Sequence, residues 1–473
     1  MHRATIKPSD AVAWVSCHRR AWLDNKYPER CADDLDAFDQ LVMELGNEHE
    51  QSILTKLRTQ FEVATASSVA HTEALMKQGT EVIYQAQLFN EAQLLIGYPD
   101  FLLRQDDGYY QAADAKLSLT ANKKEIQIQL GCYRRLLGND LPAKVFLGDG
   151  SQSIITSETD KLTEQFIDSM RTLLASDVEP SAHYGHSKCG SCQYVDHCKP
   201  QFVANGDLTL LYGVDGRAAK GLERVGIDSI SALADSDPAR IPDVPYLKGD
   251  HKKQRAVLQA QSWFSGEYHQ LRAIDLPEGT WVHFDIEDNP LTSSGDKHVY
   301  LWGFLLPDYS AAQYECVWTG SEDQDKAGWL AFLDRVAEYQ ERYPDLVLAH
   351  YASHERTTIQ QYATRYAMQD HCVVQCLLGS NSPLFDIQKP VKNNLVLPLQ
   401  GYGLKDICKH NDLVNFQWSD DGSGSQWSIV QFIRYLDAED PHEKAELKDD
   451  IISYNRDDVI ATRQLEQWLR YSI

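Results

Sequence analysis

The sequence predicts an α/β protein built from more than one domain, and three observations lead to this expectation. The chain has 473 residues, which is too many for one ordinary hydrophobic core and predicts two to four domains. Its hydrophobic content of 43% and aromatic content of 10% are typical of a globular protein. Strand-like and helix-like segments follow one another in two separate regions, one around residues 95–137 and the other from residue 280 to the end.

Composition excludes some classes of protein. The net charge of −24 argues against uniform coating of nucleic acid, because phosphate contacts need Lys and Arg, although HRRAW, ANKKE and CYRRLL can form local basic patches. The start, MHRATIKPSDAVAWVSC, lacks the apolar segment of a signal peptide, and no run approaches 18 apolar residues. We therefore expect a cytoplasmic protein without a membrane span.

The first region contains two acidic residues and a lysine at the spacing of a metal site. LLIGYPDFLL and YYQAADAKL predict two strands, and the QDDG between them favours a hairpin. Asp114 and Lys116 are two residues apart, so their side chains leave the same face of a strand. Carboxylates about 4 Å apart repel by roughly 4 kcal/mol at an effective dielectric near 20, which favours a divalent cation between Asp100 and Asp114. Such a cation can activate water and neutralise a phosphodiester, with Lys116 as a further positive charge.

Two flanking helices extend this pattern. IQIQLGCYRRLL predicts a helix on which Gln129 and Tyr133 share one face. LGNEHEQSILTKLRTQ predicts another helix, which carries His49 and Glu50.

GYPD, DAK and QLGCY, with LGNEHE upstream, resemble the PD-(D/E)XK nucleases of the RecB type. The resemblance implies a nuclease domain that binds Mg²⁺ or Mn²⁺. It assigns the metal ligands to His49, Asp100 and Asp114, the catalytic lysine to Lys116, and the helical QxxxY motif to Gln129 and Tyr133. One departure is Asp114 in place of Glu, which the family tolerates.

Four of the ten cysteines have the spacing of a metal centre. Ten cysteines are too dilute for a disulfide scaffold. HSKCGSCQYVDHCKP groups Cys189, Cys192 and Cys198, whose thiolates can bind one metal together with a distant upstream cysteine. Because His186 and His197 lie nearby, zinc in a Cys3His arrangement also satisfies this pattern, and the cluster alone does not name the metal.

One cysteine before the nuclease core and three after it resemble the iron-sulfur RecB-like nucleases, including CRISPR-associated and AddB-like members. The resemblance implies a [4Fe-4S] cluster on Cys17, Cys189, Cys192 and Cys198 that ties the two ends of the domain together. Zn²⁺ and free thiols are the alternatives. Cys31 is the rival for the upstream position, but KYPERCADDLD predicts an acidic loop and lacks the CxRRxWL context of Cys17.

Residues 206–272 predict a helical connector. LTLLYGVDGRAAKGLERVGIDSISALADSD predicts two short helices joined at GVDG, with a second turn at VGID. The glycine-rich turn, with Gly213 and Gly216 in it, resembles a helix-hairpin-helix, whose turn can present backbone N–H groups to a phosphate of duplex DNA. A helical linker without a ligand is the alternative, because Asp215 places a negative charge at the same position.

GTWVHFDIEDNP opens the last predicted domain with an alternating strand. Val282, Phe284 and Ile286 take one face, while Asp285 and Glu287 take the other. HVYLWGFLL and YECVW predict the next strands, and a sheet that opens in this way resembles that of RNase H-like proteins.

Further acidic residues follow in order. LVLAHYASHERTTIQQYA predicts a strand, a turn and a helix with Glu355 at its start, and LFDIQKPV places Asp386 on a strand as a structural or supporting acid. IISYNRDDVIATRQLEQWL predicts a helix on which Tyr454 and Asp458 share a face. Asp457 is the alternative to Asp458, but it would face away from Tyr454.

The ordered DxE, HYxSxE, FD and YNxDD motifs resemble the DnaQ-like exonucleases of the DEDDy type, fused to RecB-like modules in a bacterial and archaeal family of nucleases. The resemblance implies two metal ions held by Asp285, Glu287 and Asp458 with help from Glu355. Tyr454 would orient the attacking water. Tyr351 and Glu355 depart from the usual Asn and Asp, and Glu355 reaches one methylene further.

We therefore expect a RecB-like iron-sulfur nuclease domain over residues 1–205, a helix-hairpin-helix-like connector over 206–272, and an RNase H-like exonuclease domain over 273–473. The expected reaction is Mg²⁺- or Mn²⁺-dependent hydrolysis of DNA, either single-stranded or with free ends, and RNA is the alternative substrate. Two other functions stay open. The protein can be a non-catalytic nucleic-acid-binding adaptor, or one domain can cut while the other positions the strand.

Overall fold

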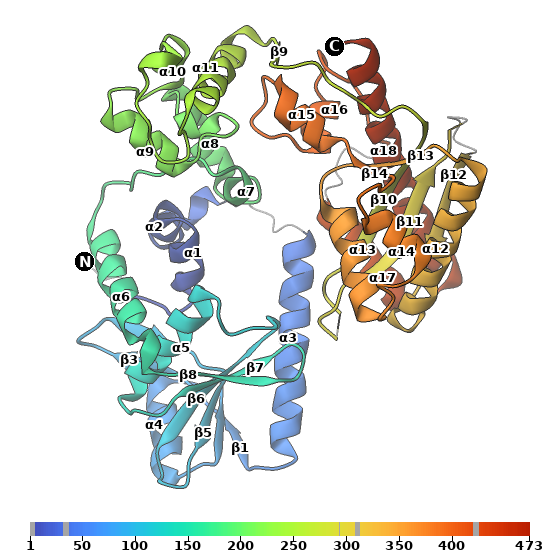
Figure 1. The fold of residues 1–473 in the computed structure, drawn as a ribbon. Helices are drawn as coiled ribbons and strands as arrows, with labels where there is room; N and C mark the ends of the chain where they lie inside the picture. Colours follow the sequence, from blue (N-terminus) through green and yellow to red (C-terminus); the bar gives the residue numbers. More distant parts are fainter. Residues whose placement is uncertain (1–4, 32–36, 293, 308–312, 420–424) are drawn as a thin grey trace. The chain divides into compact units, whose positions relative to one another are not determined.

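The computed structural model divides the chain into two compact units (Figure 1). It describes residues 5–31, 37–292, 294–307, 313–419 and 425–473. The N-terminal unit comprises Met1–His183, Ser187–Pro200 and Ser293–Gly295. The C-terminal unit comprises Tyr184–His186, Gln201–Thr292 and Asp296–Ile473.

The N-terminal unit is built on a six-stranded sheet of order β1-β2-β5-β6-β7-β8. Its strands are β1 (Val63–Thr65), β2 (Val82–Tyr84), β5 (Phe101–Arg104), β6 (Tyr110–Lys116), β7 (Ala143–Leu147) and β8 (Gln152–Ile155). Strands β2, β5 and β6 are antiparallel neighbours, and β7 returns parallel to β6 after helix α5 (Lys124–Leu137). Side chains of these strands alternate between two hydrophobic clusters. Leu102 and Ala112 face α5, whereas Phe101 and Ala113 face helix α3 (Ala37–Arg58).

The strand that the sequence predicted over LLIGYPDFLL is two strands in the structure. Strand β4 (Leu95–Gly97) pairs with β3 (Leu88–Asn90), and β5 begins only at Phe101. Pro99 explains the break, because proline lacks a backbone donor and restricts the residue before it. The predicted hairpin is confirmed, since β5 and β6 pair through a turn in which Gly108 has φ +85°.

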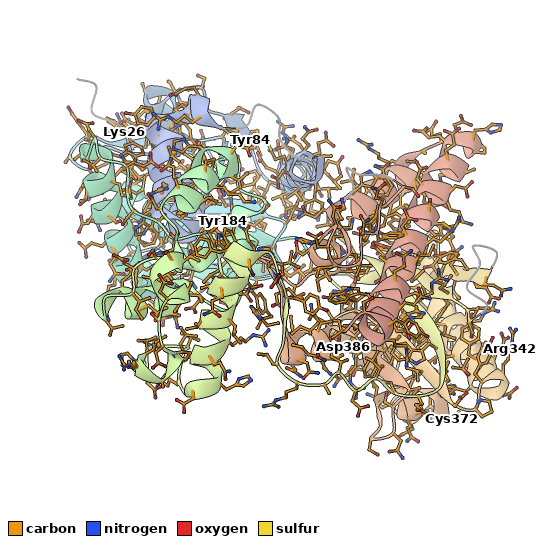
Figure 2. All side chains as sticks on the ribbon, turned by 90° about the horizontal axis from the view of Figure 1, so that it is seen from above. Lys26, Tyr84, Tyr184, Arg342, Cys372 and Asp386 are labelled. Atoms are coloured by element: carbon orange, nitrogen blue, oxygen red, sulfur yellow. The ribbon has the colours of Figure 1, made fainter. Side chains whose placement is uncertain are left out.

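The remaining helices of the N-terminal unit bring the two ends of its chain together. Helices α1 (Asp10–Ser16) and α2 (His18–Lys26) pack against α5 and α6 (Asp160–Ala175). A 3-10 turn, η1 (Pro28–Arg30), follows α2. Lys26, which is labelled in Figure 2, forms an ion pair with Asp177. The other helical elements are α4 (Val69–Gln78) and η2 (Ser157–Thr159). Two helices cross the division between the units, namely α7 (His186–Cys189) and α8 (Val195–Ala204).

The C-terminal unit contains a five-stranded sheet of order β12-β11-β10-β13-β14. Its strands are β10 (Thr280–Asn289), β11 (His298–Leu305), β12 (Tyr314–Trp318), β13 (Leu346–His350) and β14 (Leu384–Asp386). The first three are antiparallel, and β13 and β14 run parallel to β10. The parallel strands are reached through η6 (Glu322–Gln324), α12 (Asp325–Arg342), α13 (His354–Arg365) and α14 (Cys372–Leu378).

The predicted alternation of β10 is confirmed. Val282, Phe284 and Ile286 lie in the core shared with α12 and α13. The opposite face of the sheet carries Asp285 and Glu287 and is covered by α17 (Ser425–Asp437) and α18 (Pro441–Tyr471).

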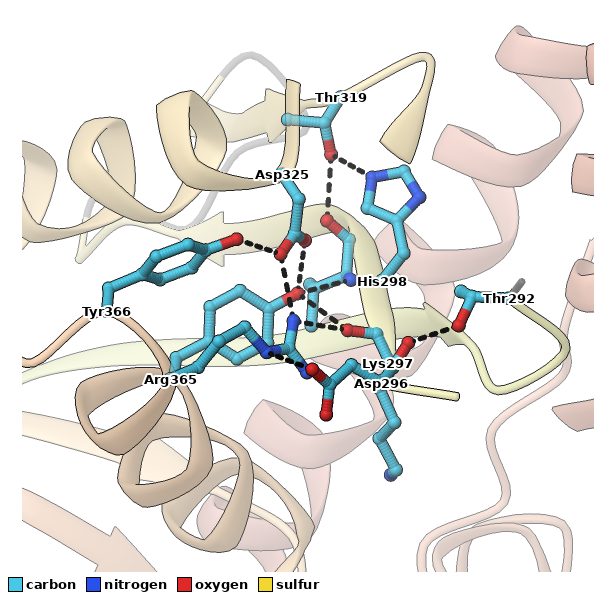
Figure 3. Close-up of polar contacts among 10 residues, drawn as sticks. Thr292, Asp296, Lys297, His298, Thr319, Asp325, Arg365 and Tyr366 are labelled. Carbon is cyan, nitrogen blue, oxygen red and sulfur yellow. Dashed lines mark hydrogen bonds and ion pairs between the residues drawn. The ribbon is translucent and has the colours of Figure 1, made fainter. Parts of the chain in front are cut away.

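A buried polar network holds the start of β11 in place (Figure 3). Asp325 accepts hydrogen bonds from Tyr362 at 2.5 Å, from Arg365 at 2.9 Å and from Tyr366 at 2.6 Å. Arg365 also donates to the backbone oxygen of Lys297 at 2.7 Å. The network thus joins α12, α13 and the entry to β11.

The predicted connector packs as part of the C-terminal unit. It contains η3 (Leu208–Leu210), α9 (Gly216–Arg224), α10 (Ile230–Ala234), η4 (Pro238–Arg240), α11 (Asp250–Ser265) and β9 (His269–Gln270). Strand β9 pairs with β15 (Leu395–Val396), and Arg255 donates to the backbone oxygen of Leu395 at 2.7 Å. The helices α15 (Gln388–Asn394) and α16 (Leu404–Cys408) flank this contact.

The sequence prediction of two helices joined at GVDG is wrong in one respect. Residues 208–212, directly before GVDG, form only the 3-10 turn η3, and Asp215 caps the start of α9. The second turn lies at VGID as predicted, with Gly226 at φ +87° between α9 and α10. Among the described residues, none of the helices has a stretch long and apolar enough to cross a membrane.

Candidate functional site

Three carboxylates converge in the C-terminal unit. Asp285 and Glu287 extend from β10, and Asp458 extends from α18. One oxygen of each lies within 4.8 Å of the others, and within the described part of the chain no other set of three or more His, Cys, Asp or Glu ligand atoms does so. We call these residues the acidic trio. A set made only of carboxylate oxygens suits a hard cation such as Mg²⁺.

Asn455, on α18, holds the two acids of β10 side by side. Its Nδ2 donates to Asp285 Oδ2 at 2.9 Å and to Glu287 Oε1 at 3.3 Å. Tyr314 donates to Asn455 Oδ1 at 2.8 Å, which fixes the orientation of the amide. Gly303 lies opposite Asp285 on β11, and a Cβ atom there would overlap Asn455 Oδ1. The glycine therefore provides the space that Asn455 occupies.

Two neutral donors orient the other carboxylates. Ser428 donates to Glu287 Oε2 at 2.6 Å, and Trp418 Nε1 donates to Asp458 Oδ1 at 2.6 Å. Neither donor neutralises the negative charge of the trio.

Burial raises the pKa values of all three acids, and the charges of neighbouring acids add to the shift. The pKa of Asp285 lies well above its usual value, first because of burial and then because of the charges of Glu287, Asp458 and Glu355. Burial and the charge of Asp458 raise the pKa of Glu287 to about 8. Burial raises the pKa of Asp458 to about 6, although Lys405 opposes the shift. A divalent cation would remove this repulsion.

Lys405, on α16, is a cation beside the trio that the sequence did not single out. Its Nζ donates to Tyr454 OH at 3.2 Å and lies 4.6 Å from the centre of the Tyr454 ring. Burial lowers the pKa of Lys405, although the charge of Asp458 opposes the shift. The available signal was the segment GYGLKDIC, which places a lysine in the first turn of a helix after two glycines.

The other predicted acids of this region lie around the trio. Glu355 is buried, and its Oε2 lies 2.9 Å from His350 Nδ1. Its charge contributes to the raised pKa of Asp285. Asp386, labelled in Figure 2, accepts from the backbone N–H groups of Ala352 and Gln388, as expected for a structural acid. Asp457 accepts from the backbone of Ser419 at 2.7 Å.

The N-terminal unit brings Asp100, Asp114 and Lys116 together. Lys116 Nζ lies 2.7 Å from Asp114 Oδ2. Asp114 Oδ1 accepts from the backbone of Asp100 at 3.0 Å, and Asp100 Oδ2 accepts from the backbone of Ala115 at 2.8 Å. Burial and the charge of Asp114 raise the pKa of Asp100 well above its usual value. Burial alone would lower the pKa of Lys116, but the charges of Asp114 and Asp100 raise it.

Gln129 and Tyr133 lie against the turn that carries Asp100. Gln129 Nε2 donates to Tyr133 OH at 3.0 Å, and Tyr133 OH donates to the backbone oxygen of Tyr98 at 3.2 Å. A Cβ atom at Gly97 would lie 3.0 Å from the Tyr133 ring, so the glycine of GYPD permits the close approach of α5.

His49 and Glu50 take different positions on α3. His49 Nε2 lies 3.2 Å from the backbone oxygen of Phe146. Glu50 accepts from Tyr84 at 2.7 Å and from Gln85 at 2.6 Å, and its charge contributes to the raised pKa of Asp100. Glu50 is therefore an acid that faces this site, whereas the resemblance assigned the ligand to its neighbour His49.

The cysteine segments from both ends of the N-terminal unit meet. Cys17 precedes α2, Cys189 ends α7, and Cys192 and Cys198 pack against the cluster of Trp22, Leu23 and Tyr194. Arg19 hydrogen-bonds with Cys198, whose pKa is raised by burial. Gln193 also donates to Asp24 at 3.0 Å.

Two further groups bear on the cysteine prediction. Cys31 packs against the same cluster as Cys192 and Cys198, and residues 32–36 of its predicted acidic loop lie outside the described residues. His197 Nε2 lies 3.3 Å from Glu179, whereas His186 belongs to the C-terminal unit and lies 3.9 Å from Asp406.

Gly213 and Gly216 lie on either side of the α9 cap. Gly213 has φ +83°, and Gly216 is the first residue of the helix. Asp215 accepts from the backbone of Arg217 at 3.0 Å and of Ala218 at 2.8 Å, so the side chain of Asp215 occupies two of the donors that a phosphate would use.

Comparison with known families places the acidic trio in a recognised domain. Residues 282–470 match the family model described as the RNase_H superfamily. Among curated proteins, none matches the chain. The matched segment contains Asp285, Glu287 and Asp458.

The C-terminal unit therefore contains an RNase H superfamily domain, and the prediction of an RNase H-like domain is confirmed. Such a domain indicates a nuclease-type function and a nucleic-acid substrate. Mg²⁺ is the common cofactor of RNase H-like nucleases and fits the all-oxygen trio.

Proposed function

We propose that the protein is a metal-dependent nuclease that hydrolyses DNA phosphodiester bonds at the acidic trio. The convergence of Asp285, Glu287 and Asp458 is the observation that carries this proposal. Burial and the charges of neighbouring acids raise their pKa values, so the site favours a bound cation. Single-stranded DNA, or DNA with free ends, is the proposed substrate.

The residues around the trio have separate roles in this proposal. Bound Mg²⁺ or Mn²⁺ would polarise the phosphodiester and lower the pKa of water. Asp285, Glu287 and Asp458 would hold the ions, while Asn455 and Ser428 keep the carboxylates oriented. Tyr454 would orient the attacking water. Lys405 holds the Tyr454 hydroxyl and adds positive charge near the phosphate.

The test is degradation of end-labelled single-stranded DNA by the full-length protein with Mn²⁺ and with EDTA. Asp285→Asn and Asp458→Asn should each remove the metal-dependent activity that arises at the acidic trio. Asp449→Asn is the matched control, because Asp449 is an exposed acid on the same helix as Asp458. Equal rates for wild type and Asp285→Asn would remove the claim.

We propose a second nuclease site of the RecB type at Asp100, Asp114 and Lys116. The support is the sheet topology, with three antiparallel strands, a helix and a parallel strand around these residues, and the close grouping of their side chains. His49, Gln129 and Tyr133 would complete it according to the resemblance, and Glu50 is a further acid that faces it. An activity that remains in Asp285→Asn and disappears in the double variant with Asp114→Asn would support this site.

The alternative is that only the C-terminal domain cuts and the N-terminal domain positions the strand. One observation favours it. Among the described residues, three or more ligand atoms of His, Cys, Asp or Glu lie within 4.8 Å of one another only in the acidic trio, and not around Asp100 and Asp114. Asp114→Asn with unchanged cleavage but weaker DNA binding would decide for this alternative.

We also propose a [4Fe-4S] cluster on Cys17, Cys189, Cys192 and Cys198, with Zn²⁺ as the alternative metal. The support is the meeting of the two cysteine segments, which lie more than a hundred and fifty residues apart in sequence. Anaerobic purification followed by iron and sulfide analysis tests this proposal. Comparing the iron and sulfide content of Cys17→Ser with that of Cys31→Ser identifies the upstream ligand. A colourless protein that holds zinc would overturn the assignment.

A further inference from the structure

A cavity of about 570 Å³ lies in the C-terminal unit away from the carboxylates of the acidic trio. Four segments line it, namely 184–186, 209–216, 246–256 and the residue Gln400. All of them belong to the C-terminal unit. The volume is within the range of pockets that hold small organic ligands.

Aromatic rings and cations contribute to its lining. The ring of Tyr212 stacks on Tyr402 with centroids 4.0 Å apart and planes at 12°. Tyr246 also lines the cavity, and the guanidinium of Arg217 lies 5.4 Å from its ring and hydrogen-bonds with its hydroxyl. Lys252 and Arg255, one turn apart on α11, add two positive charges.

Tyr246 is exposed and held in an unfavourable backbone conformation. The residue is 52% exposed, although its side chain is large and mostly apolar. Its φ is +66°, in the left-handed region that residues other than glycine rarely adopt. Strain of this kind is often retained at binding sites, where it presents a side chain to a ligand.

The charge of the lining is opposite to that of the chain. Lys252 and Arg255 are the permanent cations, and Asp215 is the one acid among the residues that line the cavity. The carboxylate of Asp215 accepts from two backbone N–H groups of α9. A protein of net charge −24 thus has a cationic, aromatic cavity, which suits an anionic ligand with a planar ring.

One short segment joins the cavity to the acidic trio. Gln400 lines the cavity, and Lys405, five residues later, reaches Tyr454 beside the trio. Five extended residues span at most about 18 Å, so the two sites lie within reach of one short nucleic-acid strand. Tyr351, which follows β13, donates to the backbone oxygen of Tyr402 at 2.6 Å and fixes the segment between them.

We propose that this cavity binds one unstacked nucleotide of the substrate strand, several nucleotides away from the bond that is cut. The base would stack on an aromatic face, with Tyr246 as its main contact, and Lys252 would meet a neighbouring phosphate. Only an unpaired base exposes its face in this way, so the site selects single-stranded nucleic acid. The inference rests on the proposed nuclease function and specifies its substrate.

The experiment measures binding of fluorescein-labelled oligothymidylate to full-length protein in EDTA by fluorescence anisotropy. Tyr246→Ala should weaken binding about ten-fold, the effect expected for one lost stacked base, while Tyr246→Phe keeps the ring and binds as wild type does. Lys252→Ala should also weaken binding and reduce its salt dependence. Phe264→Ala is the matched control, because Phe264 is an exposed aromatic residue of α11 that does not line the cavity.

A duplex of oligothymidylate and oligoadenylate separates base stacking from charge. Tyr246→Ala should leave duplex binding unchanged. Equal affinity of Tyr246→Ala and wild type for the single strand, or an equal loss for single strand and duplex, would overturn the proposal.

Because binding is measured in EDTA, it does not depend on cleavage. A wild type that binds the single strand through Tyr246 without cutting it with Mn²⁺ would contradict the nuclease function alone. With cleavage present, Tyr246→Ala should raise KM and leave kcat at saturating DNA unchanged.

Discussion

The two acidic sites of this protein differ in how their negative charge is balanced. In the N-terminal unit, Lys116 lies 2.7 Å from Asp114, so the protein supplies a cation directly to the acid. In the C-terminal unit, the acids receive hydrogen bonds from the neutral donors Asn455, Ser428 and Trp418. The acidic trio therefore keeps more uncompensated charge, and we expect it to depend more strongly on a divalent cation.

The largest expected effect tests this difference directly. Asp285→Asn should lower Mn²⁺-dependent release of nucleotides from single-stranded DNA by about 100-fold or more, because a metal ligand is lost. Asp114→Asn should lower it less, since Lys116 already balances that carboxylate. Rates of both variants measured side by side check the order. The reverse order would break the comparison.

Lys405→Met should lower kcat by roughly 10- to 100-fold, because it removes the partner of the Tyr454 hydroxyl and a positive charge beside the trio. Lys405→Arg should restore part of the rate and change the pH profile, which a purely structural role would not do. Lys409→Met is the control, because Lys405 and Lys409 both lie over the Trp418 ring, at 5.5 Å and 5.7 Å from its centre. Equal losses for the two lysines would contradict a specific role for Lys405.

Gly303→Ala should lower activity by about 10-fold through Asn455, because the new methyl group displaces the amide that holds Asp285 and Glu287 together. Asn455→Ala should produce a similar loss, and the double variant should be no worse than either single variant. Kinetics of the three proteins test this. Additive losses would show that Gly303 acts by another route.

The smallest effect concerns stability in EDTA. The folded protein raises the pKa of Glu287 from 4.5 to about 8, so the protonated acid contributes stability that is fully present below pH 4.5 and is lost as the pH rises through about 8. Glu287→Gln should therefore melt a few degrees above wild type at pH values above 8 and lose this advantage near pH 4.5. Mn²⁺ should raise the melting temperature of wild type but not of the variant. Melting curves that differ equally at both pH values would contradict the charge argument.

Short-range periodicity along single strands and helices carried most of the successful predictions. The alternation of WVHFDIE placed Asp285 and Glu287 on one face of β10, and the four-residue spacing placed Tyr454 and Asp458 on one face of α18. The same rule separated Asp457, which binds the backbone of Ser419, from Asp458 in the trio. These assignments depend only on the periodicity of a single strand or helix, so residue spacing along the chain is enough to predict them.

Tertiary structure decided which residues surround those acids. Ser428 and Trp418 reach the trio from segments more than a hundred residues from β10, and no local pattern marks such meetings. The packing of α3 on the sheet places Glu50 where its charge contributes to the raised pKa of Asp100, and places its neighbour His49 3.2 Å from the backbone oxygen of Phe146. Lys405 meets Tyr454 from a helix 49 residues away in sequence, and the cavity beside Tyr246 combines residues 184–186, connector residues and Gln400. The sequence by itself therefore identified the acids of the site. The hydrogen-bond donors and the lysine that surround these acids were determined by the tertiary structure, because contacts between distant segments depend on packing and not on spacing along the chain.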